Sequence, residues 1–561
     1  NNTSGGLRVL SDGSITIGEI TAGADAATGN GGHGAYLDNR TGTGGITING
    51  AGIFNGNTLN GLYALTNGDI TSSVGVSASN NGGYGALLDN TGSSTNNVVG
   101  LSGTNLFNNN TSGGLRVLSD GSITIGEITA GAGVGTGNGG HGAYLDNRTG
   151  TGGITINGAG IFNNNTLDGL NAQSTGNITS ASELSANDNS GNGAKLDNSS
   201  GTSNVVLTGR NTFNHNRQDG LHIISKGAVI LDNTTAGTDA GTGNGGSGAS
   251  IDNSAGNGNI NLNGAGIFNG NASSGLKTFS NGAINLVNIT ASDNISGYGA
   301  YLIAQGAGKA VTLTGTNIFN NNGLDGLYIN ANGNIDIFDV TANSNGGSGL
   351  FLRSTANITV HDCTDAANNG GVGAYADLPG LFFLRMGDFS GNGSGAYALT
   401  GGGARNVKDC VKKPKERGVN LTGEQTVPLV CVATTLTLPN GDYVSLPCPI
   451  GEASLTTLTE DDLIDALPEG TTFTSGFNLQ IVTEAGSVAV GGEARTSANE
   501  TMIVSFAIPK DQLNADLALF SWNGSKWIEV EDIMVENGHL NAQVGLNTQV
   551  DFDGLFILAS K

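Results

Sequence analysis

The sequence is poor in the residues that mark several large classes of protein. Only 8 of 561 residues are proline, and the 96 glycines follow no strict Gly-X-Y spacing, which excludes collagen. No apolar run approaches the roughly 20 residues that a membrane-spanning helix needs. Lys and Arg number 22 against 46 Asp and Glu, which gives a net charge of −24 and argues against nucleic acid as a partner.

Cysteine is also scarce. The four cysteines are Cys363, Cys410, Cys431 and Cys448. They show no C-x-x-C spacing, so the sequence predicts no zinc site, no redox motif and no cofactor. Two disulfides would suit a secreted protein, with three pairings open, and four buried free thiols are the alternative. The favoured local pair is Cys431–Cys448.

What the sequence does contain is a repeated phrase: Asn, three small or polar residues, Gly, then Leu or Ala. Asn110–Leu115 is one copy, and residues 1–61 and 109–169 are nearly identical. The glycines of the phrase lie at Gly6, Gly34, Gly61, Gly85, Gly114, Gly142, Gly169, Gly193, Gly220, Gly248, Gly275, Gly299, Gly326, Gly349, Gly373 and Gly395. Their spacing of 22–29 residues marks about 16 rungs in four-rung blocks that start near residues 6, 114, 220 and 326.

Each rung contains short runs in which apolar and polar residues alternate, such as Leu115–Val117 and Ile123–Ile125. This alternation predicts half-buried strands, with Gly and Asn at the corners between them. An antiparallel sandwich would not repeat its side-chain pattern every rung, whereas a coil of stacked strands does. The sequence therefore predicts an all-β solenoid.

Two columns of equivalent residues are predicted to stack inside the coil. One contains Phe54, Phe107 and Phe162 and is interpreted as core packing. The other is an asparagine column, in which each side chain is expected to hydrogen-bond to the next. Its members are Asn2, Asn30, Asn57, Asn81, Asn110, Asn138, Asn165, Asn189, Asn216, Asn244, Asn271, Asn322, Asn345 and Asn369; Ile295 and Gly391 stand at this position in two rungs.

Through the repeated N-x-x-x-G-[LA] phrase and the G-x-I-x-I run, residues 1–401 resemble the right-handed parallel β-helix proteins of the pectin-lyase-like superfamily. The resemblance implies a right-handed coil. It implies little about activity, since such coils serve lyases, hydrolases, adhesins and structural stalks.

The pattern changes after Gly401. Residues 402–418 are predicted to be a basic linker and a candidate interface, through Arg405, Lys408, Lys412, Lys413, Lys415 and Arg417. Residues 419–561 contain alternating runs that predict a β-sandwich. This region resembles the Ig-like or ZU5-like modules that end bacterial surface proteins.

A search for catalytic carboxylates by stacking rungs yields one cluster. Asp339 and Asp362 share a column, His361 and Arg385 share the preceding one, and Asp336, Phe338, Asp365 and Met386 lie near. An ordinary solvated face is the favoured interpretation, so no catalytic, cofactor-binding or metal residue is assigned. The pairs Asp38-Asn39 and Asp146-Asn147 are interpreted as Asx turns.

The predicted function is a secreted, cell-surface structural protein. Outer-face residues that are copied with the core suggest building material, and a chain that opens inside a rung suggests a trimmed product with an exposed strand edge. Head-to-tail self-association into a filament, stalk or surface layer is therefore expected, with no enzymatic activity. The alternative is a polysaccharide lyase or hydrolase, or a carbohydrate-binding adhesin, whose partner would be a surface glycan. The two Trp, Trp522 and Trp527, lie outside the solenoid, which argues against that alternative.

Overall fold

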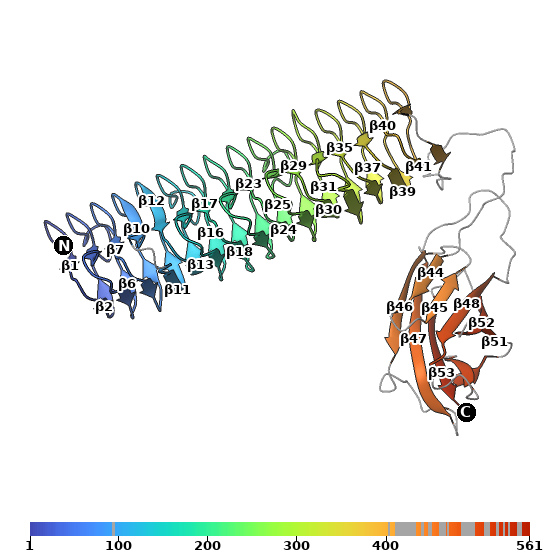
Figure 1. The fold of residues 1–561 in the computed structure, drawn as a ribbon, viewed down its shortest axis with the longest axis horizontal. Helices are drawn as coiled ribbons and strands as arrows, with labels where there is room; N and C mark the ends of the chain where they lie inside the picture. The colour runs from blue at the N-terminus through green and yellow to red at the C-terminus, as the bar shows by residue number, and fades with distance from the viewer. Residues whose placement is uncertain are drawn as a thin grey trace. The chain divides into compact units, whose positions relative to one another are not determined.

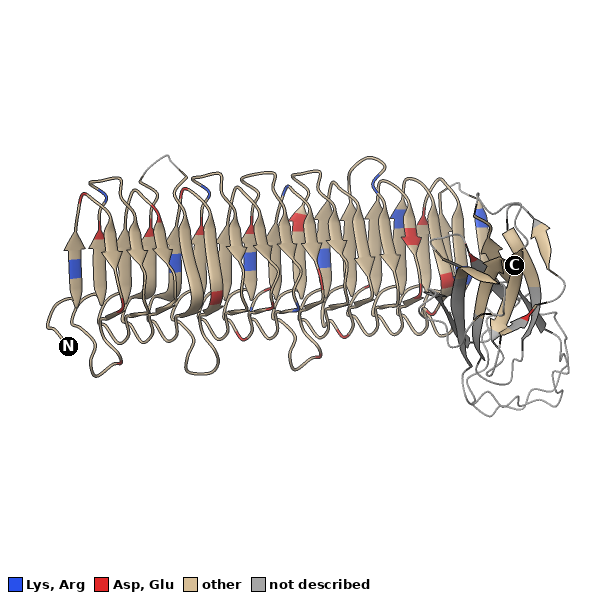
Figure 2. Cartoon of the chain, turned by 90° about the horizontal axis from the view of Figure 1, so that it is seen from below, with Lys and Arg blue, Asp and Glu red and all other residues tan. Residues whose placement is uncertain are grey.

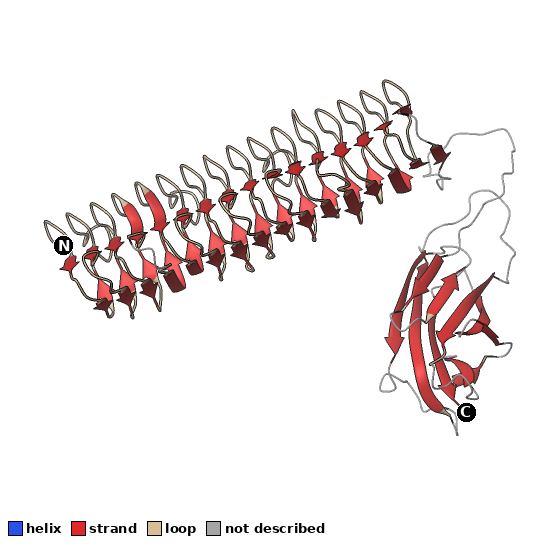
Figure 3. Cartoon of the chain, in the orientation of Figure 1, coloured by secondary structure: helices blue, strands red, loops and turns tan. Residues whose placement is uncertain are grey.

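The computed structural model describes two units of the chain, Asn1–Lys415 and Glu416–Lys561 (Figure 1). The described residues are 1–92, 96–401, 404–409, 434–438, 442–446, 451–458, 467, 471–483, 500–509, 517–522, 527–530, 533–536, 539–546 and 552–560. Every regular element among them is a strand (Figure 3), and this part of the chain has no helix with the length and apolarity of a membrane span.

The first unit is a parallel β-solenoid, as predicted. Each rung contributes one strand to a 16-stranded parallel sheet, called here the first sheet. Its strands are β1 (Leu7–Leu10), β4 (Ala35–Asp38), β7 (Leu62–Leu65), β10 (Tyr84–Asp89), β12 (Gly113–Leu118), β14 (Ala143–Asp146), β17 (Leu170–Gln173), β20 (Ala194–Asp197), β23 (Leu221–Ile224), β26 (Ala249–Asn253), β29 (Leu276–Ser280), β32 (Ala300–Ala304), β35 (Leu327–Ala331), β38 (Leu350–Ser354), β40 (Ala374–Asp377) and β42 (Tyr397–Thr400).

A second ladder follows the first sheet around each turn. Its strands are β2 (Ile15–Ile17), β5 (Ile46–Ile48), β8 (Ile70–Ser72), β11 (Val99–Leu106), β13 (Ile123–Thr129), β15 (Ile154–Ile156), β18 (Ile178–Ser180), β21 (Val205–Leu207), β24 (Val229–Leu231), β27 (Ile260–Leu262), β30 (Ile284–Val287), β33 (Val311–Thr314), β36 (Ile335–Ile337), β39 (Ile358–Thr364), β41 (Phe382–Met386) and β43 (Arg405–Asp409).

A third ladder closes each turn with two-residue strands, and β11, β13 and β39 run through the corner into it. The short strands are β3 (Ile20–Thr21), β6 (Gly52–Ile53), β9 (Val76–Ser77), β16 (Gly160–Ile161), β19 (Leu184–Ser185), β22 (Asn211–Thr212), β25 (Thr234–Thr235), β28 (Gly266–Ile267), β31 (Ile289–Thr290), β34 (Asn317–Ile318) and β37 (Val340–Thr341).

The core lies inside the coil, because alternate residues of each strand point inward. In β14 the side chains of Ala143 and Leu145 are buried, while Tyr144 and Asp146 are half-buried on the outside. The phenylalanines of the predicted Phe column, Phe54, Phe107 and Phe162 among them, are fully buried. Stacking at about 4.8 Å per rung therefore gives one continuous apolar core.

The asparagine side chains hydrogen-bond along the rod through every rung. The backbone N–H of Asn138 and its Nδ2 both donate to Asn165 Oδ1, at 2.9 Å each. Asn165 Nδ2 in turn donates to the carbonyl oxygen of Ala130 at 3.0 Å. In the two rungs where the sequence pattern breaks, Asn294 and Asn392 occupy the column, displaced by one residue. The column thereby satisfies buried polar groups at one corner.

The glycine of the repeated phrase lies where a backbone passes too close for a side chain. A Cβ added to Gly142 would lie 2.5 Å from the carbonyl oxygen of Gly169 and 2.7 Å from Asn165 Nδ2. Real Cβ atoms do not approach other atoms so closely. The repeated Asn and Gly are therefore one packing unit, in which each residue requires the other.

The solenoid continues past the predicted boundary at Gly401. Strand β43 pairs in parallel with β41 from Phe382↔Arg405 to Met386↔Asp409, so Arg405 and Lys408 belong to a rung. A basic linker beginning at residue 402 is thus wrong, because main-chain pairing fixes this segment. The remaining predicted interface residues, Lys412, Lys413, Lys415 and Arg417, lie outside the described residues, as do Cys431 and Cys448.

The second unit contains two five-stranded antiparallel sheets. The first has the order β44 (Thr434–Thr437), β45 (Tyr443–Leu446), β48 (Glu500–Ala507), β52 (His539–Leu546) and β51 (Met534–Glu536). The second has the order β46 (Gly451–Leu458), β47 (Thr472–Thr483), β53 (Phe552–Ser560), β49 (Leu517–Trp522) and β50 (Trp527–Glu529). Phe506 and Leu540 of one sheet share a core with Leu519 and Phe556 of the other, so the unit is a β-sandwich, as predicted.

Candidate functional site on the first sheet

The outward face of the first sheet varies from rung to rung. One outward residue of each strand, the second in most strands and the fourth in β10 and β12, stacks on its equivalent in the next rung. In chain order this outward column reads Arg8, Tyr36, Tyr63, Leu87, Arg116, Tyr144, Asn171, Lys195, His222, Ser250, Lys277, Tyr301, Tyr328, Phe351, Tyr375 and Ala398. Figure 2 shows this sheet face on, with isolated charged positions along its strands.

The outward column corrects the idea that the outer face is copied with the core. The first rungs of the four blocks have Arg8, Arg116, His222 and Tyr328 at this position. The first two are alike because residues 1–61 and 109–169 are nearly identical, but the later blocks diverge. Inward residues of the first sheet are apolar with few exceptions, such as Thr278. The outer face therefore has local chemistry, and duplication does not argue for building material alone.

An aromatic ladder occupies the C-terminal part of this column. The ring of Tyr328 stacks on Tyr301 at 4.7 Å and on Phe351 at 4.8 Å between centroids, with interplanar angles of 19° and 6°. Tyr375 continues the stack at 4.5 Å from Phe351. Tyr298, one residue before a repeat glycine, packs beside Tyr301 at 4.9 Å. These rings are all half-buried, so their edges form a continuous apolar strip on this face.

Carboxylate and guanidinium groups border the aromatic ladder. Asp325 Oδ1 accepts a hydrogen bond from the backbone N–H of Ser348. Burial raises the pKa of Asp325, and the Ser348 hydrogen bond opposes that rise. Burial, with the nearby Asp325 charge, also raises the pKa of Tyr298. Arg353 Nε donates to Asp377 Oδ2 at 2.9 Å on the other side of the ladder. The strip thus offers ring edges, hydroxyls and an ion pair side by side.

A hydrogen-bonded chain crosses the middle rungs along the residues that precede the repeat glycines. Asp168 N–H donates to His141 Nδ1 at 3.2 Å, and Asn192 Nδ2 donates to Asp168 Oδ1 at 3.0 Å. Because Nδ1 of His141 is an acceptor, the proton of the neutral ring is on Nε2. Burial lowers the pKa of His141, against the opposing charge of Asp168.

The same chain continues to Asp219 and His222. Asp219 N–H donates to Asn192 Oδ1 at 3.1 Å, and Ser247 N–H donates to Asp219 Oδ1 at 2.7 Å. The other carboxylate oxygen of Asp219 lies 3.0 Å from His222 Nδ1. Both oxygens of Asp219 are therefore engaged within the protein, and the imidazole of His222 has a fixed orientation.

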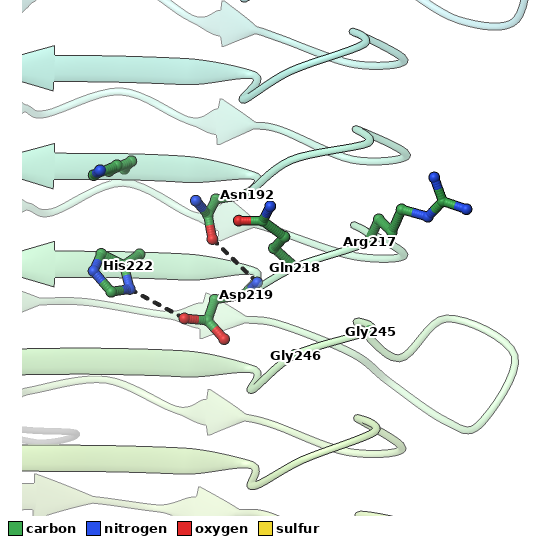
Figure 4. A pocket seen from close by; sticks show the side chains of 8 residues that line it. Asn192, Arg217, Gln218, Asp219, His222, Gly245 and Gly246 are labelled. Atoms are coloured by element: carbon green, nitrogen blue, oxygen red, sulfur yellow. Dashed lines mark hydrogen bonds and ion pairs between the residues drawn. The ribbon is translucent and has the colours of Figure 1, made fainter.

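A surface hollow of about 400 Å³ lies over this part of the sheet (Figure 4). It is lined by Asn192, Lys195, Arg217, Gln218, Asp219, His222, Gly245 and Gly246. A Cβ on Gly246 would lie 2.5 Å from Asp219 Oδ1, so glycine keeps the floor of the hollow open. A second hollow of about 640 Å³ shares Arg217 and Gly245 and contains the pair His215–Asp188, 2.6 Å apart.

The structure brings together only part of the carboxylate cluster sought in the sequence. His361 stacks on Phe338 at 4.0 Å and lies 3.4 Å from Asp336 Oδ1. Asp362 Oδ2 accepts from Asp339 N–H at 3.2 Å, and Asp339 Oδ2 accepts from Thr316.

The other members of the cluster accept hydrogen bonds from backbone N–H groups or lie on the next rung. Asp365 Oδ1 accepts from Asp388 N–H at 2.9 Å. Arg385 and Met386 are in register with Cys363, which is disulfide-bonded, and Thr364. Within the described ranges, no group of three His, Cys, Asp or Glu residues is arranged to hold a metal ion.

The repeated Asp-Asn pairs form turns. Asp38 Oδ1 accepts from Arg40 N–H at 3.2 Å, and the two side chains form an ion pair at 2.8 Å. The Arg40 guanidinium lowers the pKa of Asp38 to about 2. The copied pair Asp146–Arg148 has the same 2.8 Å contact.

Sequence reasoning missed the aromatic ladder and the hollow. Aromatic platforms were judged from tryptophan alone, whereas the ladder consists of tyrosine and phenylalanine. A signal was present: the residue two after the repeat glycine is Tyr301, Tyr328, Phe351 and Tyr375 in four successive rungs. The hollow has no such signal, because its residues come from three rungs and each rung supplies different side chains.

Comparisons with known proteins identify no family for this chain. No family model matches the chain, and no curated protein matches it. Among solved structures, the chain is similar to tailspike protein gp49 from Acinetobacter baumannii bacteriophage Fri1, a capsular polysaccharide depolymerase. The identity is 10%, the match covers 92% of this chain and 79% of that chain, and the TM-score is 0.14.

Two predictions about function need correction. A structural, filament-forming rod without enzymatic activity was predicted, whereas the matched protein is a polysaccharide depolymerase. The prediction also rested on a copied outer face, whereas the outward column repeats only in the first two rungs of the first two blocks. Since the likeness is too low to transfer any residue, the function has to be argued from the face itself.

Proposed function

We propose that the solenoid binds an extended polysaccharide along the outward face of its first sheet. The observation that carries the proposal is the aromatic ladder from Tyr301 to Tyr375, half-buried and continuous over four rungs. A contiguous apolar strip on a soluble surface marks an interaction site. Sugars present both C–H faces and hydroxyls, which suit ring edges, phenol groups and a bordering ion pair.

Two geometric features support a linear ligand. The strip runs along the solenoid axis, and four rungs at about 4.8 Å give roughly 14 Å between its first and last rings. The hollow at His222 lies on the same sheet, three rungs before Tyr301. A chain-like ligand can follow both features without leaving the face. Such ligands occur outside cells, so an extracellular or cell-surface location is part of the proposal.

The test is binding of the full chain to a panel of purified bacterial and plant polysaccharides, measured by isothermal titration calorimetry. We expect Tyr328→Ala to lower affinity at least tenfold, about 1.4 kcal/mol, through loss of its contact area. Tyr63→Ala is the matched control, since Tyr63 is also a half-buried tyrosine of the outward column but lies near the N-terminus. Equal effects of the two variants, or unchanged affinity in Tyr328→Ala, would contradict the proposal.

Cleavage of the bound polysaccharide is a second candidate, favoured by the Asp219–His222 pair. An imidazole whose Nδ1–H is held by a carboxylate has Nε2 available as a proton acceptor. Release of reducing ends from a bound polysaccharide, abolished by His222→Gln while binding persists, is the expected result. Cleavage that His222→Gln leaves unchanged would place the chemistry elsewhere.

We also propose a fold family for each of the two units. Right-handed coiling of the pectin-lyase-like kind, and an Ig-like or ZU5-like second unit, rest on resemblance and are supported by the parallel rungs and the two five-stranded sheets. A crystal structure with a left-handed coil would contradict the first assignment. A strand connectivity foreign to Ig-like domains would contradict the second.

A further inference from the structure

The corner between the second and third ladders repeats one exposed dipeptide in the second rung of the first three blocks. The copies are Asn49-Gly50, Asn157-Gly158 and Asn263-Gly264. Each follows a strand of the second ladder and precedes a two-residue strand of the third, so it belongs to neither. The asparagine side chain is exposed in all three copies. The coil therefore presents three equivalent amides to water.

Hydrogen bonds at this corner leave the side-chain amide and the next N–H without partners. The N–H of Asn157 donates to the carbonyl oxygen of Ile125 in the preceding rung at 2.8 Å, and its carbonyl accepts from Ser182 Oγ at 3.0 Å. Within the described ranges, neither the Asn157 amide nor the N–H of Gly158 makes a hydrogen bond. The asparagine N–H is bonded to the preceding rung in the other two copies as well.

The asparagine column contains the same dipeptide in the opposite environment. Asn138, which Gly139 follows, is 1% exposed. Its Nδ2 donates to Asn165 Oδ1 and to the carbonyl oxygen of Phe107, at 2.9 Å each. The N–H of Gly139 donates to the carbonyl oxygen of Asn110 at 2.8 Å. Both groups that would have to react are thus held by the fold.

An Asn-Gly peptide has a reaction of its own when these groups are not held. Glycine has no side chain to obstruct the approach of its nitrogen to the neighbouring amide carbon. The nitrogen loses its proton and bonds to the side-chain carbon of the asparagine, and the bond from that carbon to the amide nitrogen breaks. The amide nitrogen leaves as ammonia, and a cyclic imide remains. Water then opens the imide to aspartate or isoaspartate, with no oxidation or reduction.

We infer that Asn49, Asn157 and Asn263 are sites of spontaneous deamidation in the folded protein, with water as the co-reactant. Each event replaces a neutral amide by a carboxylate in a chain whose net charge is −24. The column asparagines, such as Asn138, are protected by the hydrogen bonds that stack the rungs. The inference is independent of polysaccharide binding.

Isoaspartate at this corner would also alter the rung. It lengthens the main chain by one atom between β15 and β16, immediately before Gly160 pairs with Ile128. The corner is tightly packed, because a Cβ added to Gly158 would lie 2.5 Å from the backbone nitrogen of Glu127. The new carboxylate would therefore lie in the rung stacked on an existing acidic residue.

The experiment incubates the full chain in mildly alkaline buffer made with heavy-oxygen water, and follows the modification by peptide mass spectrometry over time. Cleavage after Lys and Arg places Asn138 and Asn157 on separate peptides, residues 117–148 and 149–195. Fragmentation of each peptide locates the incorporated oxygen. We expect Asn157 to convert at least about tenfold faster than Asn138, since reaction at Asn138 requires its hydrogen bonds to open first.

Two controls assign the difference to the fold. In concentrated urea the two dipeptides should convert at similar rates, because the protecting contacts are gone. Asn157→Gln keeps an exposed amide but would have to close a larger, less favoured ring, so position 157 should then remain unmodified. Circular dichroism verifies the fold of this variant.

Three results would overturn the inference. One is equal conversion of Asn138 and Asn157 in the folded chain. Another is a folded chain in which neither converts while both convert in urea, which would mean that the corner is protected too. The third is a difference of the same size in urea, which would assign it to local sequence instead of structure.

Discussion

The two sides of the first sheet follow different rules, although they alternate along the same strands. Inward residues such as Leu302 and Leu352 are apolar in every block and fully buried. Outward residues at one block position change from Arg116 to His222 to Tyr328. The inner side must fit the rungs above and below, whereas the outer side meets solvent or a ligand. Repetition of the inner side therefore says nothing about what the outer side does.

Neighbouring residues of β32 give the sharpest test of this difference. Leu302→Ala should destabilise the solenoid by about 4 kcal/mol, because it opens a cavity in a close-packed core. Tyr301→Ala should cost only about 1 kcal/mol, since its ring is half-buried, but should weaken polysaccharide binding. Calorimetric unfolding and titration of both variants measure the two effects. Loss of binding in Leu302→Ala while its fold is intact would break the division between the sides.

The asparagine column is polar, but it lies inside the coil and must also fit the rungs above and below. Asn165→Ala should cost about 3 kcal/mol, because the buried N–H of Asn138 and the carbonyl of Ala130 lose their partner. Exposed Asn49 is a control whose replacement by Ala should change the unfolding free energy by less than about 0.5 kcal/mol. Equal effects in a urea titration would show that the column is dispensable.

The carboxyl of Asp325 lies on the outer side but is partly buried, and this burial should make the free energy of unfolding depend on pH. Burial raises its folded pKa, so ionisation weakens the fold, and this loss develops as pH rises through the folded pKa. Asp325→Asn retains an acceptor for Ser348 N–H and should stabilise the chain at neutral pH by less than the Asn165 effect. Near pH 3, where the carboxyl is already protonated, the gain should vanish. A gain of the same size at both pH values would exclude this cause.

The smallest effect is expected at the Asp38–Arg40 pair on the outer corner. The pKa of Asp38 is lowered from 3.8 to about 2, so its stabilising contribution is present above about pH 4 and is lost as pH falls towards 2. Solvent screens this contact, since the Arg40 side chain is 54% exposed, so Arg40→Ala should cost only about 0.5 kcal/mol at pH 7. Thermal unfolding at pH 7 and pH 2 measures the difference, and a cost that persists at pH 2 would contradict the ion-pair explanation.

The sequence predicts the fold of the solenoid more fully than it predicts the candidate site. The rung period, the four-rung blocks and the buried Phe54 and Phe107 could be read from spacing, because stacking forces equivalent residues into the same environment. The asparagine column was missed at Asn294 and Asn392, where one residue is gained or lost before the glycine. The solenoid's extension through β43 was missed because Arg405–Asp409 lacks the repeated phrase.

The sequence alone determined that the first unit coils, since only a stacked coil explains a column that recurs every rung. Only the tertiary structure decided which outward residues meet. Lys195, Arg217 and His222 lie up to 27 positions apart, and the register β20 to β23 brings them to one hollow. The physical reason is that core packing constrains every rung alike and leaves a periodic trace, whereas a surface site uses the few side chains that differ.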